Sequence, residues 1–431
     1  MIRLIKNGRV LNPASGEDAV RDIVIDKGAI VNTGADTGAT SDIPDNAIID
    51  AKDCWVIPGI VDLAARFREP GQEHKGTIAS ESKAALAGGI TGICLQPDTD
   101  PVIDTPAVID LIQQRAGKIT GPAIYTLGAI SIDLQGQQLS EFAALKSAGC
   151  VGVSHAGRYV EDSQLMRNIM DYAASHDLKI FLTAEDSRLA EAGCAHEGAI
   201  ATRLGLPGIP TAAETIAVAR DLLLIETTGV AAHFCRLSSA GSVEMIARAK
   251  DAGLDVSADV AAHQLFLTDM DISNFDGNMH VRPPLRSMRD KDALREAVKS
   301  GVIDAICSDH QPHEADAKLA PFGETSPGIT GLDTLAALLL KLVHEADLEP
   351  LAAVQSVTSS PADILGILGT AAGTLNSGAR ADIAIINPQT NWTYDANDSE
   401  SNGRNTAFNG WQFRGRVTHT LLGGKLVHQT R

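Results

Sequence analysis

The chain has 431 residues, of which 44% are hydrophobic and 21% are charged. This balance is typical of a globular protein and excludes disorder or a coiled coil as a description of the whole chain. The formal net charge of −18 repels phosphates and anionic lipids, so we expect no nucleic-acid and no membrane partner. No apolar run approaches the ~20 residues that a membrane span needs, and the opening MIRLIKNGRV does not resemble a signal peptide. We therefore expect a cytoplasmic protein.

The two ends of the chain share one pattern. The first 55 residues form short segments in which apolar and polar residues alternate, as in β-strands joined by turns. The same pattern returns after about residue 370, in ADIAIINP and GRVTHTLLGGKLVH. We expect residues 1–55 and 370–431 to pair into one small composite β-sandwich domain.

Residues 56–369 alternate short apolar runs with segments of helical periodicity, which is clear at 163–176 and 211–229. This alternation predicts βαβ units around a parallel sheet that is buried on both faces. Eight such units predict a closed (β/α)8 barrel, with a doubly wound open sheet as the alternative. The eight runs expected to be strands begin at Val56, Ile90, Ala123, Val151, Lys179, Val230, Asp255 and Ile303.

The cysteines give no sign of a metal or redox motif. The chain has 6 of them, they are scattered, and they form no C-x-x-C pair. We therefore expect buried, reduced thiols.

The active site of a (β/α)8 barrel lies where its strands end. Asp309, His310 and His313 follow the last expected strand, and His155, His233 and His263 lie near the ends of three others. The same loops carry five arginines, which would repel a metal ion and attract an anion. They are Arg66, Arg68, Arg158, Arg236 and Arg282.

The three histidines near the strand ends, His155, His233 and His263, are candidate ligands of a metal site. His233 and Arg236 are three residues apart, and side chains alternate along a strand, so we expect them to face opposite ways. This places His233 against the outer helices. An alternative metal site built from His155, His233 or His263 stays open, with His155 beside Asp309 as its best form.

Several segments resemble the bacterial class I dihydroorotases, in the same order along nearly the whole chain. They are DLAARFREPG, GGITGICLQPDTDP, AEDSRL, SSAGSVEMI, HQLFLTD, VRPPLRSMRD, IDAICSDHQPH, APFG and GITGLDT. The resemblance implies an amidohydrolase (β/α)8 barrel with a composite β domain. It also implies zinc and dihydroorotase activity where the family's ligands are present.

The chain departs from the family at the metal-binding positions. Ala64 and Arg66 stand where the family has the two histidines of His-x-His, and His155 or Ala156 stands near the bridging ligand. The other two histidine ligands correspond to Thr183 and Arg236. Asp309 alone matches, and in the family it is also the general base. The positions that resemble the substrate pocket are Arg68, Asp98, Arg282 and His313.

These departures predict a protein without zinc and without catalytic residues, since Ala64 cannot bind a metal and the arginines stay protonated. We expect Asp309 to pair with Arg66 or Arg236 instead. Arg68 either holds an anion or pairs with Asp62, Glu69 or Asp98.

The resemblance also implies a role. Some bacteria carry a non-catalytic dihydroorotase-like chain that assembles with aspartate transcarbamoylase in pyrimidine synthesis, and we expect this chain to be one, as a homodimer or larger oligomer. An active dihydroorotase with an atypical metal site is the alternative. A third interpretation is a small-molecule sensor with an anion pocket at Arg68.

Overall fold

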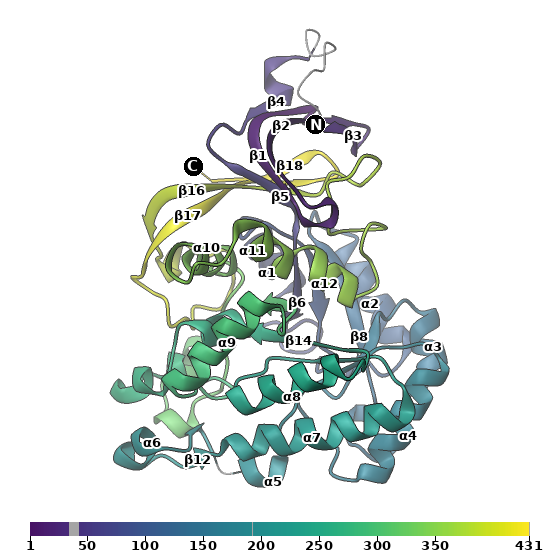
Figure 1. Cartoon of the computed structure of the whole chain (residues 1–431), viewed down its shortest axis with the longest axis vertical. Coiled ribbons are helices and arrows are strands. Elements are labelled where there is room, and N and C mark those ends of the chain that lie inside the picture. Colours follow the sequence, from purple (N-terminus) through teal and green to yellow (C-terminus); the bar gives the residue numbers. More distant parts are fainter. Residues whose placement is uncertain (34–42, 192, 431) are drawn as a thin grey trace.

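The computed structural model of the protein describes residues 1–33, 43–191 and 193–430 and contains two large sheets (Figure 1). The first has eight strands that are hydrogen-bonded in sequence order, each parallel to its neighbour. It forms the predicted barrel. Its strands are β6 (Ile60–Ala65), β7 (Ile90–Leu95), β8 (Ala123–Ala129), β9 (Gly152–Ser154), β10 (Ile180–Leu182), β13 (Ala232–Phe234), β14 (Val256–Ala261) and β15 (Ala305–Cys307).

The barrel closes just beyond the end of β15. His310 forms a parallel bridge with Ala65 of β6. The His310 N–H donates to Ala64 O at 3.1 Å, and the Arg66 N–H donates to His310 O at 2.9 Å. The Asp62 carboxylate accepts the Ser308 N–H at 2.8 Å. The first and last strands are therefore joined at the level where the functional loops begin.

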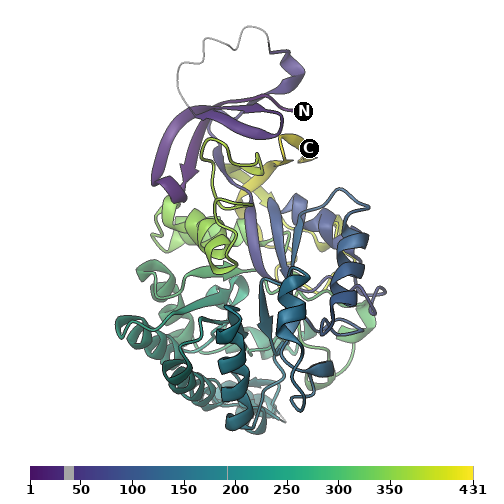
Figure 2. The ribbon, with the colours of Figure 1, turned by 90° about the vertical axis from the view of Figure 1, so that its right-hand side faces the viewer.

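Helices cover the outside of the barrel (Figure 2). The helix predicted at 163–176 is α4 (Ser163–Ser175). It begins after Asp162, whose carboxylate accepts the N–H groups of Gln164 and Leu165. Its buried residues, Met166, Ile169, Met170 and Ala173, follow the spacing of one helix face. The helix predicted at 211–229 is α7 (Thr211–Thr228).

The twelve helices within the described ranges are α1 (Ile78–Ala87), α2 (Pro106–Ala116), α3 (Phe142–Ser147), α4 (Ser163–Ser175), α5 (Ser187–Ala190), α6 (Ala199–Leu204), α7 (Thr211–Thr228), α8 (Ala240–Asp251), α9 (Met288–Ser300), α10 (Leu335–Glu345), α11 (Pro350–Val357) and α12 (Ser359–Ile364). None of them, in this part of the chain, is both long and apolar enough to cross a membrane. All six cysteines are buried and unpaired. A small separate pair is formed by β11 (Ala195–His196) and β12 (Gly208–Ile209).

Both chain ends enter the second large sheet, in the order β18-β17-β16-β5-β1-β2-β3 with β4 beside β1. This sheet curves back on itself. The Ile2 N–H, just before β1, donates to the O atom of Gly424, which lies between β17 and β18 at the far edge of the strand order, at 2.8 Å. Figure 1 shows both termini on it. Its strands are β1 (Leu4–Asn12), β2 (Glu17–Asp26), β3 (Ala29–Thr33), β4 (Ile48–Asp50), β5 (Trp55–Pro58), β16 (Ile383–Thr393), β17 (Gln412–Leu422) and β18 (Lys425–Gln429).

The strand predicted to begin at Val56 is divided between the two sheets, which corrects that prediction. Val56 lies in β5, which pairs with β1 and β16, and the barrel begins only at Ile60. Gly59 lies between the two strands. Glycine is needed there, because a Cβ atom would lie 2.1 Å from Thr91 Oγ1. The apolar run is continuous in sequence, so periodicity could not reveal this break.

Helices α10 and α11 fill the space between the second sheet and the barrel (Figure 1): α10 packs on β17, and α11 contacts β1 and β15. The loop between β16 and β17 adds polar contacts to the barrel. The Asn402 N–H donates to Glu81 Oε1 of α1 at 3.1 Å, and Asn405 Oδ1 accepts the His313 N–H at 2.8 Å. The C-terminal segment thereby helps to position the loop after β15.

Candidate functional site

The centre of the site is Asp309, which follows β15 and is buried beside two arginines. Arg236 Nε lies 3.3 Å from Asp309 Oδ1, and Arg66 Nη1 lies 3.8 Å from the same oxygen. Gln311 donates to this oxygen from Nε2 at 3.1 Å. Both arginines that the sequence offered as partners of Asp309 therefore reach it.

Arg236 is held by two further contacts besides Asp309. Its backbone N–H donates to Asp259 Oδ1 of β14 at 2.6 Å, and its Nη2 donates to Thr183 Oγ1 at 2.8 Å. The Arg236 side chain is 2% exposed. The predicted site residues Thr183, Arg236 and Asp309 thus lie together at the strand ends.

Arg66 and Arg68 contact different residues. Arg66 Nε pairs with Asp98 Oδ2 at 2.6 Å. Arg68 Nε donates to Pro312 O at 3.2 Å, and its Nη2 lies 3.3 Å from His313 Nε2. Asp98, which we offered as a partner of Arg68, is therefore paired with Arg66, whereas Arg68 and His313 of the predicted pocket are neighbours.

Arg282, the remaining predicted pocket residue, lies farther out. It pairs through Nε with Glu185 Oε1 at 2.6 Å, and its side chain is 43% exposed. Glu185 follows β10 in the segment Thr183-Ala184-Glu185-Asp186, two residues after the position of the absent histidine, and no sequence signal identified it as a partner of Arg282.

The other metal-position residues supply no charge. Ala64 is buried and offers only a methyl group. His155 is buried, and its Nδ1 has no hydrogen-bond partner among the described residues. The Ala156 N–H donates to Ser154 Oγ at 3.1 Å.

Burial and neighbouring charges control protonation here. Burial raises the pKa of Asp309 above its ordinary range, and the charges of Arg236 and Arg66 oppose that increase. Burial would lower the pKa of Arg236, but the Asp309 carboxylate raises it above its usual value. Burial, followed by the charge of Arg66, lowers the pKa of Arg68 to about 10.

The neighbouring histidines are held neutral. Burial lowers the pKa of His155 to about 3, with Arg220 and Arg236 adding to the effect. Burial and Arg236 lower the pKa of His263 to about 3. The pKa of His313 is also about 3, because of burial and then Arg68. Each imidazole therefore has one N–H donor near neutral pH.

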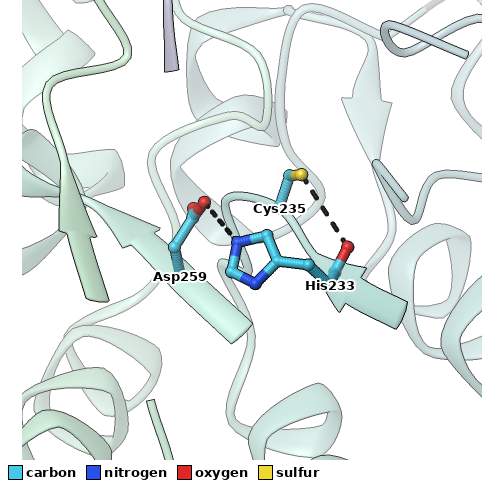
Figure 3. A group of neighbouring side chains, drawn as sticks. All are labelled: His233, Cys235 and Asp259. Carbon is cyan, nitrogen blue, oxygen red and sulfur yellow. Dashed lines mark hydrogen bonds and ion pairs between the residues drawn. The ribbon is translucent and has the colours of Figure 1, made fainter. Parts of the chain in front are cut away.

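His233 lies inside the barrel, so the prediction that it packs against the outer helices is wrong. Figure 3 shows it facing Asp259, with Cys235 beside it. Its ring lies 5.2 Å from that of Phe181. The alternation argument failed because β13 ends at Phe234 and Arg236 has a φ of 53°, so strand alternation does not extend to it.

His233, Cys235 and Asp259 have the donor types of a metal site, with ligand atoms within 4.8 Å of one another. Their lone pairs and protons are already used in hydrogen bonds. His233 Nε2 lies 2.8 Å from Asp259 Oδ2, and Nδ1 lies 2.8 Å from Ser257 Oγ. Burial also raises the pKa of the Cys235 thiol far above its ordinary value, which disfavours the thiolate that binds metals. We assign this group to positioning Arg236 through Asp259.

Four site residues have left-handed backbones at the loops that follow strands. A non-glycine residue in this conformation costs about 1 kcal/mol or more, and such strain is concentrated at functional sites. Propensity gives no signal at Arg68, Ala156 or Arg236, whereas aspartate, as at Asp309, adopts this conformation more readily than most residues. They are Arg68 (φ 64°), Ala156 (φ 51°), Arg236 (φ 53°) and Asp309 (φ 46°).

Comparisons with known proteins agree with this architecture. The Dihydro-orotase-like family model matches residues 54–242. The chain is 43% identical to a dihydroorotase-like protein of Pseudomonas putida, covering 98% of both chains. It is also 43% identical to a dihydroorotase of Anaeromyxobacter dehalogenans, over 99% of this chain and 98% of that one.

The fold itself matches L-hydantoinase (dihydropyrimidinase) from Arthrobacter aurescens, with a TM-score of 0.88, 25% identity and coverage of 100% of this chain and 96% of that chain. Relatives named dihydroorotase and relatives named dihydroorotase-like protein both align from end to end. The chain belongs to the dihydroorotase-like family of the amidohydrolase superfamily.

Proposed function

We propose that this chain is a catalytically inactive dihydroorotase-like protein that supports the assembly or activity of aspartate transcarbamoylase. The observation that carries the proposal is the pair of guanidinium groups, Arg66 and Arg236, on either side of Asp309. They stand at two positions where the resemblance places metal-binding histidines.

The side chains at these positions do not fit zinc. Zinc needs nitrogen, oxygen or sulfur lone pairs at about 2.0–2.3 Å, whereas Ala64 offers a methyl group and the guanidinium groups stay protonated. The Thr183 hydroxyl already accepts a hydrogen bond from Arg236. A dication beside Arg66 and Arg236 would be repelled, so we propose no metal-bound water and no hydrolysis.

The assembly role rests on the family resemblance and on a complete scaffold. Barrel and β domain are both present, although of the side chains that the chemistry would need at the family's metal positions only Asp309 remains. A protein of this kind can act through its outer surface. Its formal net charge of −18 implies that a contact with another acidic chain needs an apolar patch, and that a basic partner is favoured.

An apolar strip on α7 is the first surface to test. Ile216 and Leu223 are seven residues apart on this helix and are 49% and 65% exposed. Leu189 of the neighbouring α5 is 41% exposed. Exposed apolar side chains that gather on one face can form an interaction site, which makes this face of α7 the one to vary first.

The metal test is elemental analysis of the protein purified in zinc-supplemented buffer. We expect less than one zinc per chain and no dihydroorotase turnover. Stoichiometric zinc together with turnover that Asp309→Ala abolishes would instead support the alternative, an active dihydroorotase with an atypical metal site.

The partner test is co-expression of the organism's aspartate transcarbamoylase with and without this chain. We expect a larger particle and higher transcarbamoylase activity when the chain is present. The double variant Ile216→Ser/Leu223→Ser should weaken association, whereas Glu226→Ser on the same helix serves as the matched control. Unchanged particle mass and activity with the wild-type chain would reject the partner.

A further inference from the structure

The segment 314–328, between β15 and α10, is attached to its neighbours through one ammonium group. We call this segment the rim strap. Its residues, all of them described, form only short 3-10 turns. Lys318 Nζ donates to Ser326 O at 2.6 Å and to Gly328 O at 2.8 Å within the strap. It also donates to Gly277 O at 3.0 Å in the segment after β14, so one side chain both closes the strap and attaches it to the next loop of the barrel.

Two histidine rings outside the strap face it as hydrogen-bond donors. His280 Nδ1 lies 2.8 Å from Thr325 Oγ1. The Thr325 hydroxyl donates its own proton to Phe322 O at 2.8 Å, so the proton of the first bond comes from His280. His313 Nε2 lies 3.0 Å from Pro327 O, which can only accept. In each ring the other nitrogen is therefore the one that acid would protonate.

Both rings are buried among cations. His280 and His313 are 7% and 6% exposed. Burial lowers the pKa of His280 to about 4 and that of His313 to about 3, and neighbouring positive charges add to both effects. The cations that act on the two rings are Lys318, Arg282, Arg68 and Lys75.

Carboxylates offset part of this charge but do not relieve the burial. Those that act on or pair with the cations are Asp276, Glu314 and Glu185. Burial is the largest cause of the lowered pKa of both rings, and movement of the strap would return them to water. Burial lowers the pKa of Lys318 to about 8, so this ammonium stays charged at and below pH 7.

We propose that the rim strap is released by acid: protonation of His280 and His313 detaches residues 314–328 from the loop after β14 while the barrel stays folded. The sign follows from the buried, neutral rings. The closed strap is fully favoured above pH ~6.5, and this preference is lost as the pH falls toward 4 for His280 and toward 3 for His313. Between pH 7 and pH 5, one such ring shifts the opening equilibrium by roughly 20-fold. The inference concerns this chain alone and stands or fails apart from the assembly role.

The test is hydrogen–deuterium exchange of the purified full chain, read by mass spectrometry at pH 7 and pH 5 and corrected for the intrinsic pH dependence of exchange. We expect peptides from 314–328 to exchange at least ~20-fold faster at pH 5. Peptides from α4 should keep their protection, because the barrel stays folded.

The double variant His280→Asn/His313→Gln keeps an N–H donor near each ring position but cannot be protonated, so its strap should exchange equally at both pH values. His176→Asn, at the end of α4, is the matched control and should respond like wild type. Equal exchange of the wild-type strap at pH 7 and pH 5 would overturn the proposal, and this result needs no variant to fold. Loss of protection in α4 together with the strap, or an acid response that persists in the double variant, would also overturn it.

Discussion

Among the site residues, we expect substitution of Asp309 to lower the stability of the fold most. Its carboxylate lies 3.3 Å from the buried Arg236 guanidinium, so Asp309→Ala leaves a buried cation without its nearest counter-charge. We expect the free energy of unfolding to fall by about 3–5 kcal/mol. Equilibrium urea unfolding of both proteins measures the difference.

The control for this substitution is Asp18→Ala. Asp18 pairs with Arg9 at 2.7 Å, but the two side chains are 36% and 40% exposed, and exposed pairs contribute about 0–1 kcal/mol. If Asp309→Ala were as mild as Asp18→Ala, the ion pair would not be what fills the site.

The neutral histidines predict acid sensitivity. The pKa of His263 is about 3 when folded, against about 6.5 for an ordinary histidine. The depressed value stabilises the folded state above pH ~6.5, and this contribution is lost as the pH falls toward 3. Burial raises the pKa of Asp62 to about 6, which acts in the opposite direction between pH ~4 and ~6.

Comparison of urea unfolding at pH 7 and pH 5 isolates the histidine contribution. Wild type should lose about 2 kcal/mol more between these pH values than His263→Asn, at about 1.4 kcal/mol per pH unit for one group. His74→Asn, at a side chain that is 61% exposed, should behave like wild type. Identical pH dependence in wild type and His263→Asn would show that this ring is not buried neutral.

At the scale of single residues, the sequence indicated which groups would meet but not how they are held. Asp309, Arg236 and Thr183 could be placed together because strand ends share one rim of a barrel. The role of Asp259 could not be predicted, because it depends on a hydrogen bond to the Arg236 backbone. The side of the strand on which His233 lies was predicted wrongly, because the left-handed turn at Arg236 breaks the alternation of side chains.

At the scale of elements, Glu214 connects α7 with the start of α8. Its carboxylate accepts the N–H groups of Ser238 and Ser239 at 3.1 and 3.0 Å and the Ser239 hydroxyl at 2.8 Å. Glu214→Ala should lower the free energy of unfolding by about 3 kcal/mol, because buried N–H groups lose their acceptor. Chemical denaturation measures this loss.

Glu226 is the matched control, because it lies exposed on the same helix. Glu226→Ala should change stability by less than about 0.5 kcal/mol. Similar effects of the two substitutions would indicate that the loss of Glu214 acts through helix propensity and not through the loop after β13.

Periodicity found the helices and strands but not the point where the chain changes sheet. The buried face of α4 and the cap at Asp162 are both local signals, and the helix begins and ends close to the predicted residues. The division between β5 and β6 depends on contacts with β16, more than 300 residues later. A continuous apolar run cannot carry that information.

At the scale of the whole molecule, the two chain ends depend on each other. Val56 and Ile57 of β5 pair with Ile385 and Ala384 of β16, and the buried core of this sheet draws Ile5, Ile23, Ile383 and Leu421 from both ends. The sheet also covers α10, which packs on β17. Neither end can bury its apolar face alone.

A chain that ends at Gly373 should therefore lose its cooperative thermal transition and bind a hydrophobic dye such as ANS, because β5 and α10 lose their cover. Co-expression of residues 374–431 as a separate chain should restore the transition, since it returns β16, β17 and β18 to their neighbours. Differential scanning calorimetry of both preparations is the measurement. A sharp transition in the shortened chain alone, near the wild-type temperature, would mean that the barrel folds without the second sheet and that the two ends contribute only to its surroundings.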